Sequence, residues 1–395
     1  MNRLWIEPER KLRWLRITIS VNAIIAFALS WRLWVSSRLF PLIPISDLLS
    51  SIPFPLDYVL FFALLGILLA IIAINNPSKI VLTFVILTGL LTLWDQMRLQ
   101  PWVYQYLFML AAIGLFGRKE SAADKREMAL NSCRFVLIAT YVWSGAQKLN
   151  INFARKIWPD LAGPALSHLP HAVRTLPPIT ALVLPMLEIG IGVGLMTRRF
   201  RNLSVVLAIL MHIIILSMLV VSRENMVVWP WNIAMIGFNL ILFWRDRETG
   251  PGSFFVVRSW FQGAVLISFG VLPALSFFGL WDSYLSCALY SGNTDEGVVY
   301  VSSPVIGQLP AALRPYIWQI DQPFFLDINR WAYGELNVPV YPEPRVYRRA
   351  AEEICVYARD SLDVQLRIYQ RPNPLTGARK SEYLNCTQLG GIPRD

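Results

Sequence analysis

Tyr141-Val-Trp-Ser-Gly-Ala-Gln-Lys-Leu-Asn-Ile-Asn-Phe153 ends an apolar run that is long enough to cross a membrane. Between Cys133 and Lys148 the only formal charge is Arg134, at the start of the run. At about 1.5 Å of rise per residue, Lys148 lies roughly 22 Å from Cys133, close to the far face of a hydrocarbon layer about 30 Å thick. The stretch therefore predicts a membrane-spanning helix with a lysine near its end.

The side chains beside this lysine give it two readings. Tyr141, Ser144 and Lys148 have helical spacing and share one face, while Gly145 next to them would let another backbone or a flat ligand approach. A lysine at a helix end can simply extend its charge to the membrane surface. A polar face inside a helix bundle instead indicates a functional site. In both readings Lys148 has no charged partner, so Lys148→Met should leave folding almost intact.

The composition is that of a membrane protein. Hydrophobic residues make up 55% of the 395 residues and charged residues only 16%, with 15 tryptophans. The mean hydropathy is +0.46. A water-soluble domain carries about 25% charged residues. The net charge of +10 therefore indicates basic flanks of membrane helices and lipid contact, and no basic run with interleaved aromatic residues points to nucleic acid.

Apolar runs predict an all-α polytopic bundle, residues 1–282, followed by a small α+β domain, residues 283–395. About nine spans are expected, at residues 15–35, 57–74, 79–96, 103–118, 133–149, 177–197, 202–221, 227–244 and 261–281. In the outer domain, Val298–Ser302, Val364–Tyr369 and Lys380–Leu384 read as strands, and Pro344–Ala358 reads as a helix.

Basic residues predict the orientation. In a nine-span chain, five basic segments fall on the same side, which places the N-terminus in the cytoplasm and the C-terminal domain outside. These segments contain Arg3, Arg10, Lys11 and Arg13; Lys79; Arg118, Lys119, Lys125 and Arg126; Arg198, Arg199 and Arg201; and Arg245 and Arg247.

The cysteines and histidines show no metal or thiol-redox spacing. Cys133, Cys287, Cys355 and Cys386 include no CxxC pair, and the three histidines form no HExxH motif. A hairpin folded back on the outer helix would bring Cys355 and Cys386 together, so we predict a disulfide between them, with Cys287 free at the membrane boundary. The alternative is that all three are buried thiols.

Two further pairs lie in the predicted spans. Asp95 and Arg98 are neighbours at the end of the third span and reach the same outer level as Lys148, either as part of a site or as an interfacial clamp. Glu188 and His212 lie at similar depths, about 15 Å from the short loop that joins their spans. Because a lone carboxylate in hydrocarbon is unfavourable, pairing of Glu188 with His212 is expected.

These residues resemble a known family. Tyr141–Phe153 resembles the aromatic–Ala/Ser-Gly-x-x-Lys-Leu-Asn/Asp signature of vitamin K-dependent γ-glutamyl carboxylases and of their bacterial relatives, the horizontally transferred transmembrane (HTTM) domains. The likeness covers roughly residues 80–300, and DoxX-like and MauE-like redox membrane proteins share the general plan. Where the carboxylases have Asp-x-x-His, this chain has Asp95-x-x-Arg98, and an arginine can hold an anion but does not exchange a proton near neutral pH.

The resemblance implies a quinone- or lipid-linked enzyme acting on an exported peptide or protein at the outer leaflet. Lys148, Asp95 and Arg98 would be catalytic, and a reduced, vitamin K-like quinone would lie near Tyr141, Ser144, Gly145, Glu188 and His212. The reaction class stays open between carboxylase-like and quinone-dependent oxidoreductase-like. The alternatives are a DoxX/MauE-like redox accessory protein and a non-catalytic scaffold or maturation factor for an exported partner.

Overall fold

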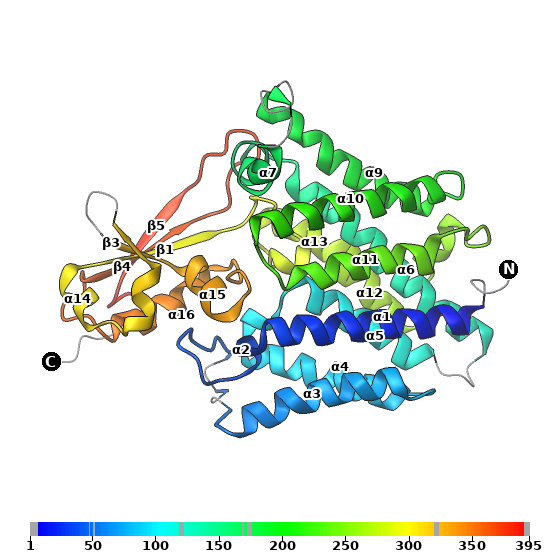
Figure 1. Ribbon diagram of the computed structural model, residues 1–395, viewed down its shortest axis with the longest axis horizontal. Helices are drawn as coiled ribbons and strands as arrows, with labels where there is room; N and C mark the ends of the chain where they lie inside the picture. Colours follow the sequence, from blue (N-terminus) through cyan, green and yellow to red (C-terminus); the bar gives the residue numbers. More distant parts are fainter. Residues whose placement is uncertain are drawn as a thin grey trace.

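The protein is a helical bundle with a small α+β domain at one end (Figure 1). The computed structural model describes residues 7–46, 48–49, 52–117, 122–167, 170–171, 176–319 and 324–390. Arg3, Arg118, Lys119 and His168 lie outside these residues.

Helices or helical segments occupy all nine predicted spans. They are α1 (Pro8–Leu29), α3 (Leu56–Ala73), α4 (Ser78–Trp94), α5 (Pro101–Phe116), α6 (Ala123–Lys148), η3 with α9 (Pro178–Met196), α10 (Arg201–Ser222), α11 (Val228–Phe243) and the segment α12 to η6 (Trp260–Phe278). Short elements connect them: α2 (Trp31–Trp34), η1 (Gln96–Arg98), η2 (Phe153–Ile157), α7 (Trp158–Leu166), η4 (Pro251–Phe255) and η7 (Tyr284–Ser286).

Five of these helices are long and apolar enough to cross a membrane: Pro8–Leu29, Leu56–Ala73, Pro178–Met196, Arg201–Ser222 and Trp260–Phe278. Helices α4, α5 and α11 are apolar but shorter. Large apolar side chains point outward from the bundle, including Phe62, Ile86 and Ile214, each more than half exposed. Such a surface suits lipid, so the chain is an integral membrane protein, while the count of nine spans stays a prediction.

Contacts fix which helix ends lie together. Near the outer domain, Asn337 Nδ2 donates to Leu29 O (2.9 Å), and Ile151 N donates to Pro374 O (2.8 Å). At the opposite end, Asp246 lies 2.9 Å from Arg134 Nη2 and 3.9 Å from Lys11 Nζ. The N-terminal part of α1 therefore lies at the end of the bundle away from the domain, as the alternating spans require (Figure 1). The side of the membrane that each end faces stays a prediction.

The outer domain contains one antiparallel sheet, in the order β2-β3-β1-β4-β5. Its strands are β1 (Glu296–Val301), β2 (Ile317–Gln319), β3 (Phe324–Asp327), β4 (Val364–Tyr369) and β5 (Ser381–Asn385). Its helices are α14 (Ser303–Gln308), η8 (Ala311–Tyr316), α15 (Ile328–Leu336) and α16 (Pro344–Cys355). The three strands and the helix expected from sequence are confirmed with shifts of a few residues at their ends.

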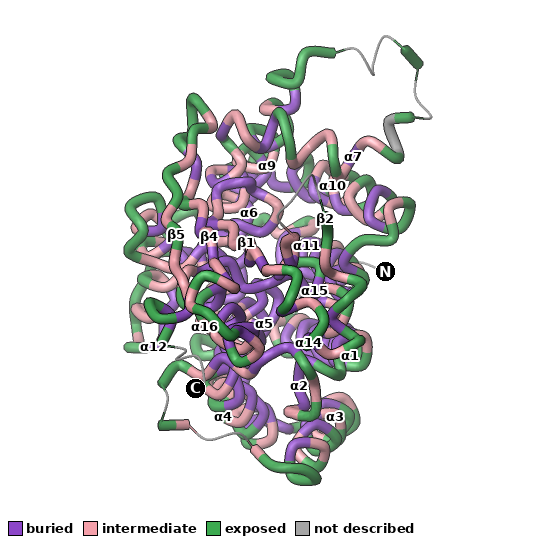
Figure 2. The backbone as a smooth tube through the Cα atoms, turned by 90° about the vertical axis from the view of Figure 1, so that its left-hand side faces the viewer, coloured by how far each residue is buried: buried purple, intermediate pink, exposed green. Residues whose placement is uncertain are grey.

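The predicted disulfide is present. Cys355, at the end of α16, is bonded to Cys386, directly after β5, and both residues are buried. Cys287 is free and partly exposed, and Cys133 is free and buried. Seen from the domain end, the buried residues fill the interior of both the bundle and the domain (Figure 2).

Candidate functional site

Helices α6 and α9 touch backbone to backbone, which sets the place of the candidate site. A Cβ atom added to Gly145 of α6 would lie 2.6 Å from Pro185 O and 2.7 Å from Ile189 Cγ1. One added to Gly192 of α9 would lie 2.8 Å from Val142 Cγ2. Both glycines therefore permit an approach that any larger residue would prevent.

This close contact brings Lys148 against Glu188. The ammonium Nζ lies 2.8 Å from Glu188 Oε2 and also donates to Ser144 Oγ, one turn earlier on α6. The side chains are 16% and 12% exposed. A carboxylate and an ammonium that are both largely removed from water depend on each other, because either charge left unpaired there is strongly unfavourable. The lysine is therefore half of an ion pair, and the simple reading of a lysine extending alone to the surface does not describe it.

A second chain of hydrogen bonds lies deeper in the bundle. Tyr141 OH is 2.8 Å from His212 Nε2, and His212 Nδ1 is 2.8 Å from Asn232 Oδ1. Asn239 Nδ2 donates to Tyr141 OH at 2.6 Å. Each asparagine amide also donates to the carbonyl four residues earlier in α11, which fixes its orientation. Asn232 thus presents its oxygen to His212.

These orientations assign the tautomer of His212. Because Asn232 Oδ1 can only accept, His212 carries its proton on Nδ1, and its Nε2 accepts from the Tyr141 hydroxyl. The donors then run in one direction, from Asn239 through Tyr141 and His212 to Asn232. This arrangement is satisfied with a neutral imidazole.

The expected pairing of Glu188 with His212 is wrong. Glu188 projects from α9 toward α6, where Lys148 meets it, whereas His212 projects from α10 toward Tyr141 and Asn232. Two side chains at equal depth in neighbouring helices meet only when each helix presents the face that carries its side chain to the other helix. We call Tyr141, Ser144, Lys148, Glu188, His212, Asn232 and Asn239 the intramembrane polar cluster.

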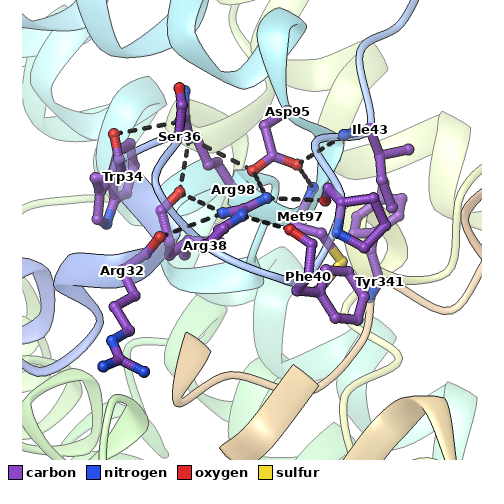
Figure 3. A network of polar contacts seen from close by, with 12 residues as sticks. Arg32, Trp34, Ser36, Arg38, Phe40, Ile43, Asp95, Met97, Arg98 and Tyr341 are labelled. Atoms are coloured by element: carbon purple, nitrogen blue, oxygen red, sulfur yellow. Dashed lines mark hydrogen bonds and ion pairs between the residues drawn. The ribbon is translucent and has the colours of Figure 1, made fainter. Parts of the chain in front are cut away.

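Asp95 and Arg98 form a separate network, shown in Figure 3. Arg38 Nη2 lies 2.6 Å from Asp95 Oδ2, and Arg98 Nε lies 3.7 Å from the same oxygen. All three side chains are at most 2% exposed. Arg98 also donates to the carbonyls of Leu33, Leu91 and Trp34, at 2.9, 2.9 and 3.2 Å.

Most donors of this network bond to backbone carbonyls of the segment that follows α1, and one donor of Arg98 bonds to Leu91 O in α4. Arg38 donates to Leu33 O, Phe40 O and Pro41 O, and Asp95 accepts from the backbone N–H of Met97. The network therefore fastens the segment after α1 to the end of α4, as the clamp reading of Asp95 and Arg98 expects. Among the described residues, no hydrogen bond or ion pair joins Arg38, Asp95 or Arg98 to Lys148.

The residues after Lys148 join the bundle to the outer domain. Gln147 Oε1 accepts from Asn293 Nδ2 at 2.7 Å, and Asn150 Nδ2 donates to Ser291 O at 2.9 Å. Asn152 Nδ2 donates to Gly292 O at 2.8 Å. Gly292 has a positive φ of 68°, and an added Cβ would lie 2.9 Å from Asn152 Nδ2. The ion pair of Lys148 thus lies one residue from the junction between the domains.

The described packing does not fit a flat cofactor at Gly145. The open side of this glycine is filled by Pro185 and Ile189 of α9, and the Tyr141 hydroxyl is engaged by His212 and Asn239. Within the described residues, no group of three or more His, Cys, Asp or Glu side chains could hold a metal ion. We therefore derive no quinone step from this geometry.

Sequence reasoning missed three members of these networks. Asn232 and Asn239 are seven residues apart on one face of α11, inside an apolar run, and this spacing was a readable signal for a polar face. Arg38 gave no such signal, because it lies in a connection where a basic residue is ordinary.

Comparison with known proteins gives one match within the chain. Residues 126–227 match the family model described as methylamine utilisation protein MauE. No curated protein and no solved structure shows a match. The matched residues run from α6 to the start of α11 and so include Tyr141, Lys148, Glu188 and His212. This part of the chain is therefore similar to MauE, which supports the DoxX/MauE-like resemblance and gives no support to the carboxylase one.

Proposed function

We propose that this chain is a MauE-like membrane accessory protein that assists the maturation of an exported partner. The observation that carries the proposal is the position of the match, which covers the helices that bear Lys148, Glu188 and His212. The same helix α6 continues directly into the junction with the outer domain. A partner bound to that domain could thus be connected to the intramembrane polar cluster.

Thiol exchange by the chain's own cysteines is not part of the proposal. A disulfide that exchanges with a partner must be reached by an attacking thiolate. Cys386 is fully buried and Cys355 is 4% exposed, so their bond has a structural role. Cys133 is buried near the opposite end of the bundle. Cys287 is free and partly exposed, but no second free cysteine of the described chain lies beside it to form an exchanging pair. An accessory role through binding is therefore favoured over electron transfer to exported thiols.

The test combines loss of the protein with capture of its partner. In a host strain that lacks the chain, we expect one or a few exported proteins to fall in abundance or to lack their mature form. A photo-crosslinker placed at Trp318 or Tyr383, exposed residues of the two edge strands β2 and β5, should capture one of the same proteins. An unchanged set of exported proteins would contradict the proposal.

The role of the cluster is tested by complementation. A double variant, Lys148→Met with Glu188→Leu, removes both charges. Produced in the strain that lacks the chain, it should insert into the membrane normally but should not restore maturation of the partner. Lys156→Met is the matched control, because Lys156 pairs with Glu296 at 3.3 Å on the exposed surface near the same junction. Full complementation by the double variant would assign the ion pair to stability alone.

A reduced quinone near Lys148 is the competing proposal for this site. Lipid extraction from the purified full chain, followed by mass analysis, distinguishes the two. A quinone retained by the wild-type chain and lost from the double variant would favour a quinone-linked reaction. Equal, substoichiometric amounts in both would favour the accessory role.

A further inference from the structure

A polar groove opens at the end of the bundle away from the outer domain. It lies between the start of α1, the connection between α3 and α4, and the end of α5. Its lining includes Arg10, Arg13, Arg16, Asn75, Asn76 and Ser78. Nothing in the proposed accessory function uses this groove.

Arg16 is the unusual residue of this groove. It is only 5% exposed, and among the described residues its Nε has no hydrogen-bond partner and its guanidinium has no ion pair. A buried cation without a counterion is strongly unfavourable, so side chains of this kind are normally paired. The other buried arginines of the described bundle follow that rule: Arg98, Arg134 and Arg201 each have an acidic partner within 4.0 Å.

The surroundings of Arg16 add to the positive charge. Arg13 and Arg10 precede it at helical spacing and line the same groove. Two carboxylates, Glu7 and Glu9, also line it. Glu7 lies 3.3 Å from Arg10 at the exposed rim, which leaves Arg13 and Arg16 against Glu9. Counted over the described lining residues, three arginines against two glutamates give the groove a net positive charge.

The start of α4 faces the same space. This helix begins at Ser78, which lines the groove, and its N-cap is Pro77, which has no side-chain acceptor. The first N–H groups of a helix lack partners within the helix and carry partial positive charge, so they bind anions. The 17 residues of α4 give a full helix dipole.

We propose that this groove binds a phosphate group, with Arg16 and Arg13 as the guanidinium donors and the first turn of α4 as the backbone donor. A guanidinium binds phosphate through two parallel N–H···O bonds, which would satisfy the free Nε of Arg16. The groove lies where α3 ends, at Ala73, and α4 begins. This level is that of lipid headgroups, so the phosphate comes either from a phospholipid of that leaflet or from solution.

The experiment uses the full chain, purified and stripped of lipid, with three probes: phosphatidylglycerol, diacylglycerol and inorganic phosphate. Native mass spectrometry should show phosphatidylglycerol retained by the wild-type chain and diacylglycerol, which lacks the phosphate, lost. Arg16→Gln should weaken the retention by about 10- to 100-fold, the range for one charge-assisted contact. Arg247→Gln, at the same end but outside the groove lining, should leave it unchanged.

Two further measurements identify the source of the phosphate and provide a second variant in case the first does not fold. If inorganic phosphate raises the Tm of the wild-type chain but not of Arg16→Gln, while lipid retention is equal in both, the phosphate is a soluble one. If Arg16→Gln does not fold, Arg13→Gln at the same groove replaces it. Equal phosphatidylglycerol retention in wild type and variant, together with no Tm response to phosphate, would overturn the proposal.

Discussion

The ion pair between Lys148 and Glu188 predicts that replacing either residue alone lowers the free energy of unfolding and that replacing both lowers it much less. At the observed 2.8 Å and an effective dielectric constant of about 20, the attraction is about 6 kcal/mol before the desolvation of both groups is subtracted. Removing one partner of a buried pair typically costs about 3–5 kcal/mol, because it leaves an uncompensated charge. With 16% and 12% exposure, we expect about 3 kcal/mol for Lys148→Met. This replaces the expectation from sequence, in which Lys148 was a lone lysine that methionine could replace without loss of folding.

The double variant separates this reasoning from general damage. Replacing both residues, Lys148→Met with Glu188→Leu, leaves no unpaired charge, so most of the lost free energy of unfolding should return. The assay is reversible unfolding in lipid nanodiscs, read as a double-mutant cycle, and the coupling energy should be about 2 kcal/mol or more. The exposed Lys156–Glu296 pair serves as the control and should couple by less than about 1 kcal/mol. If the effect of the double variant equals the sum of the two single effects within about 0.5 kcal/mol, the ion pair is refuted.

Four further predictions concern other parts of the molecule. Gly145→Val should prevent correct packing of α6 on α9, seen as loss of the folded fraction in size-exclusion chromatography, whereas Gly163→Val, with nothing near its Cβ position, should not. Replacing Cys355 and Cys386 by alanine removes a crosslink over 31 residues and should lower the free energy of unfolding of the outer domain by about 3–4 kcal/mol; free thiols at both positions in non-reducing peptide maps of the wild type would contradict this. Cysteines introduced at Arg247 and at Leu375, both exposed, should react with impermeant reagents from opposite sides of the membrane, and labelling from one side only would exclude the proposed orientation. Burial raises the pKa of Glu343, so the unfolding free energy should fall as pH rises from the ordinary carboxyl pKa through the raised one, and Glu343→Gln should flatten this part of a pH titration of stability.

The positions of the helices could be predicted from the sequence because lipid imposes a simple rule. Each span must bury about 20 residues in hydrocarbon, and the apolar runs of α3 and α10 show this directly. Helix α6 is predicted from the apolar run that Lys148 ends. The central strand β1 and its partner β4 were found from their β-branched residues, whereas β2 and β3, three and four residues long, are too short to give a pattern.

The partners inside the bundle could not be predicted in the same way. Whether Glu188 meets Lys148 or His212 depends on the rotation of α9 about its axis, and this is set by the contacts of Gly145 and Gly192 with the facing helix. Depth counted along a helix carries no information on rotation. The sequence therefore indicates which residues are polar at membrane depth but leaves their pairing open.

The order of strands in the outer sheet has a consequence for how the domain forms during synthesis. The central strand β1 pairs on one side with β4, which follows more than 60 residues later, and the crosslink to Cys386 closes later still. At about 5–20 residues per second, the ribosome needs roughly 3–14 s to make the residues from the end of β1 to the end of β4. During this time one edge of β1 is exposed and open to wrong pairing. A chaperone or a bound partner on the receiving side of the membrane would have its greatest effect in this interval, before β4 is available to pair with β1.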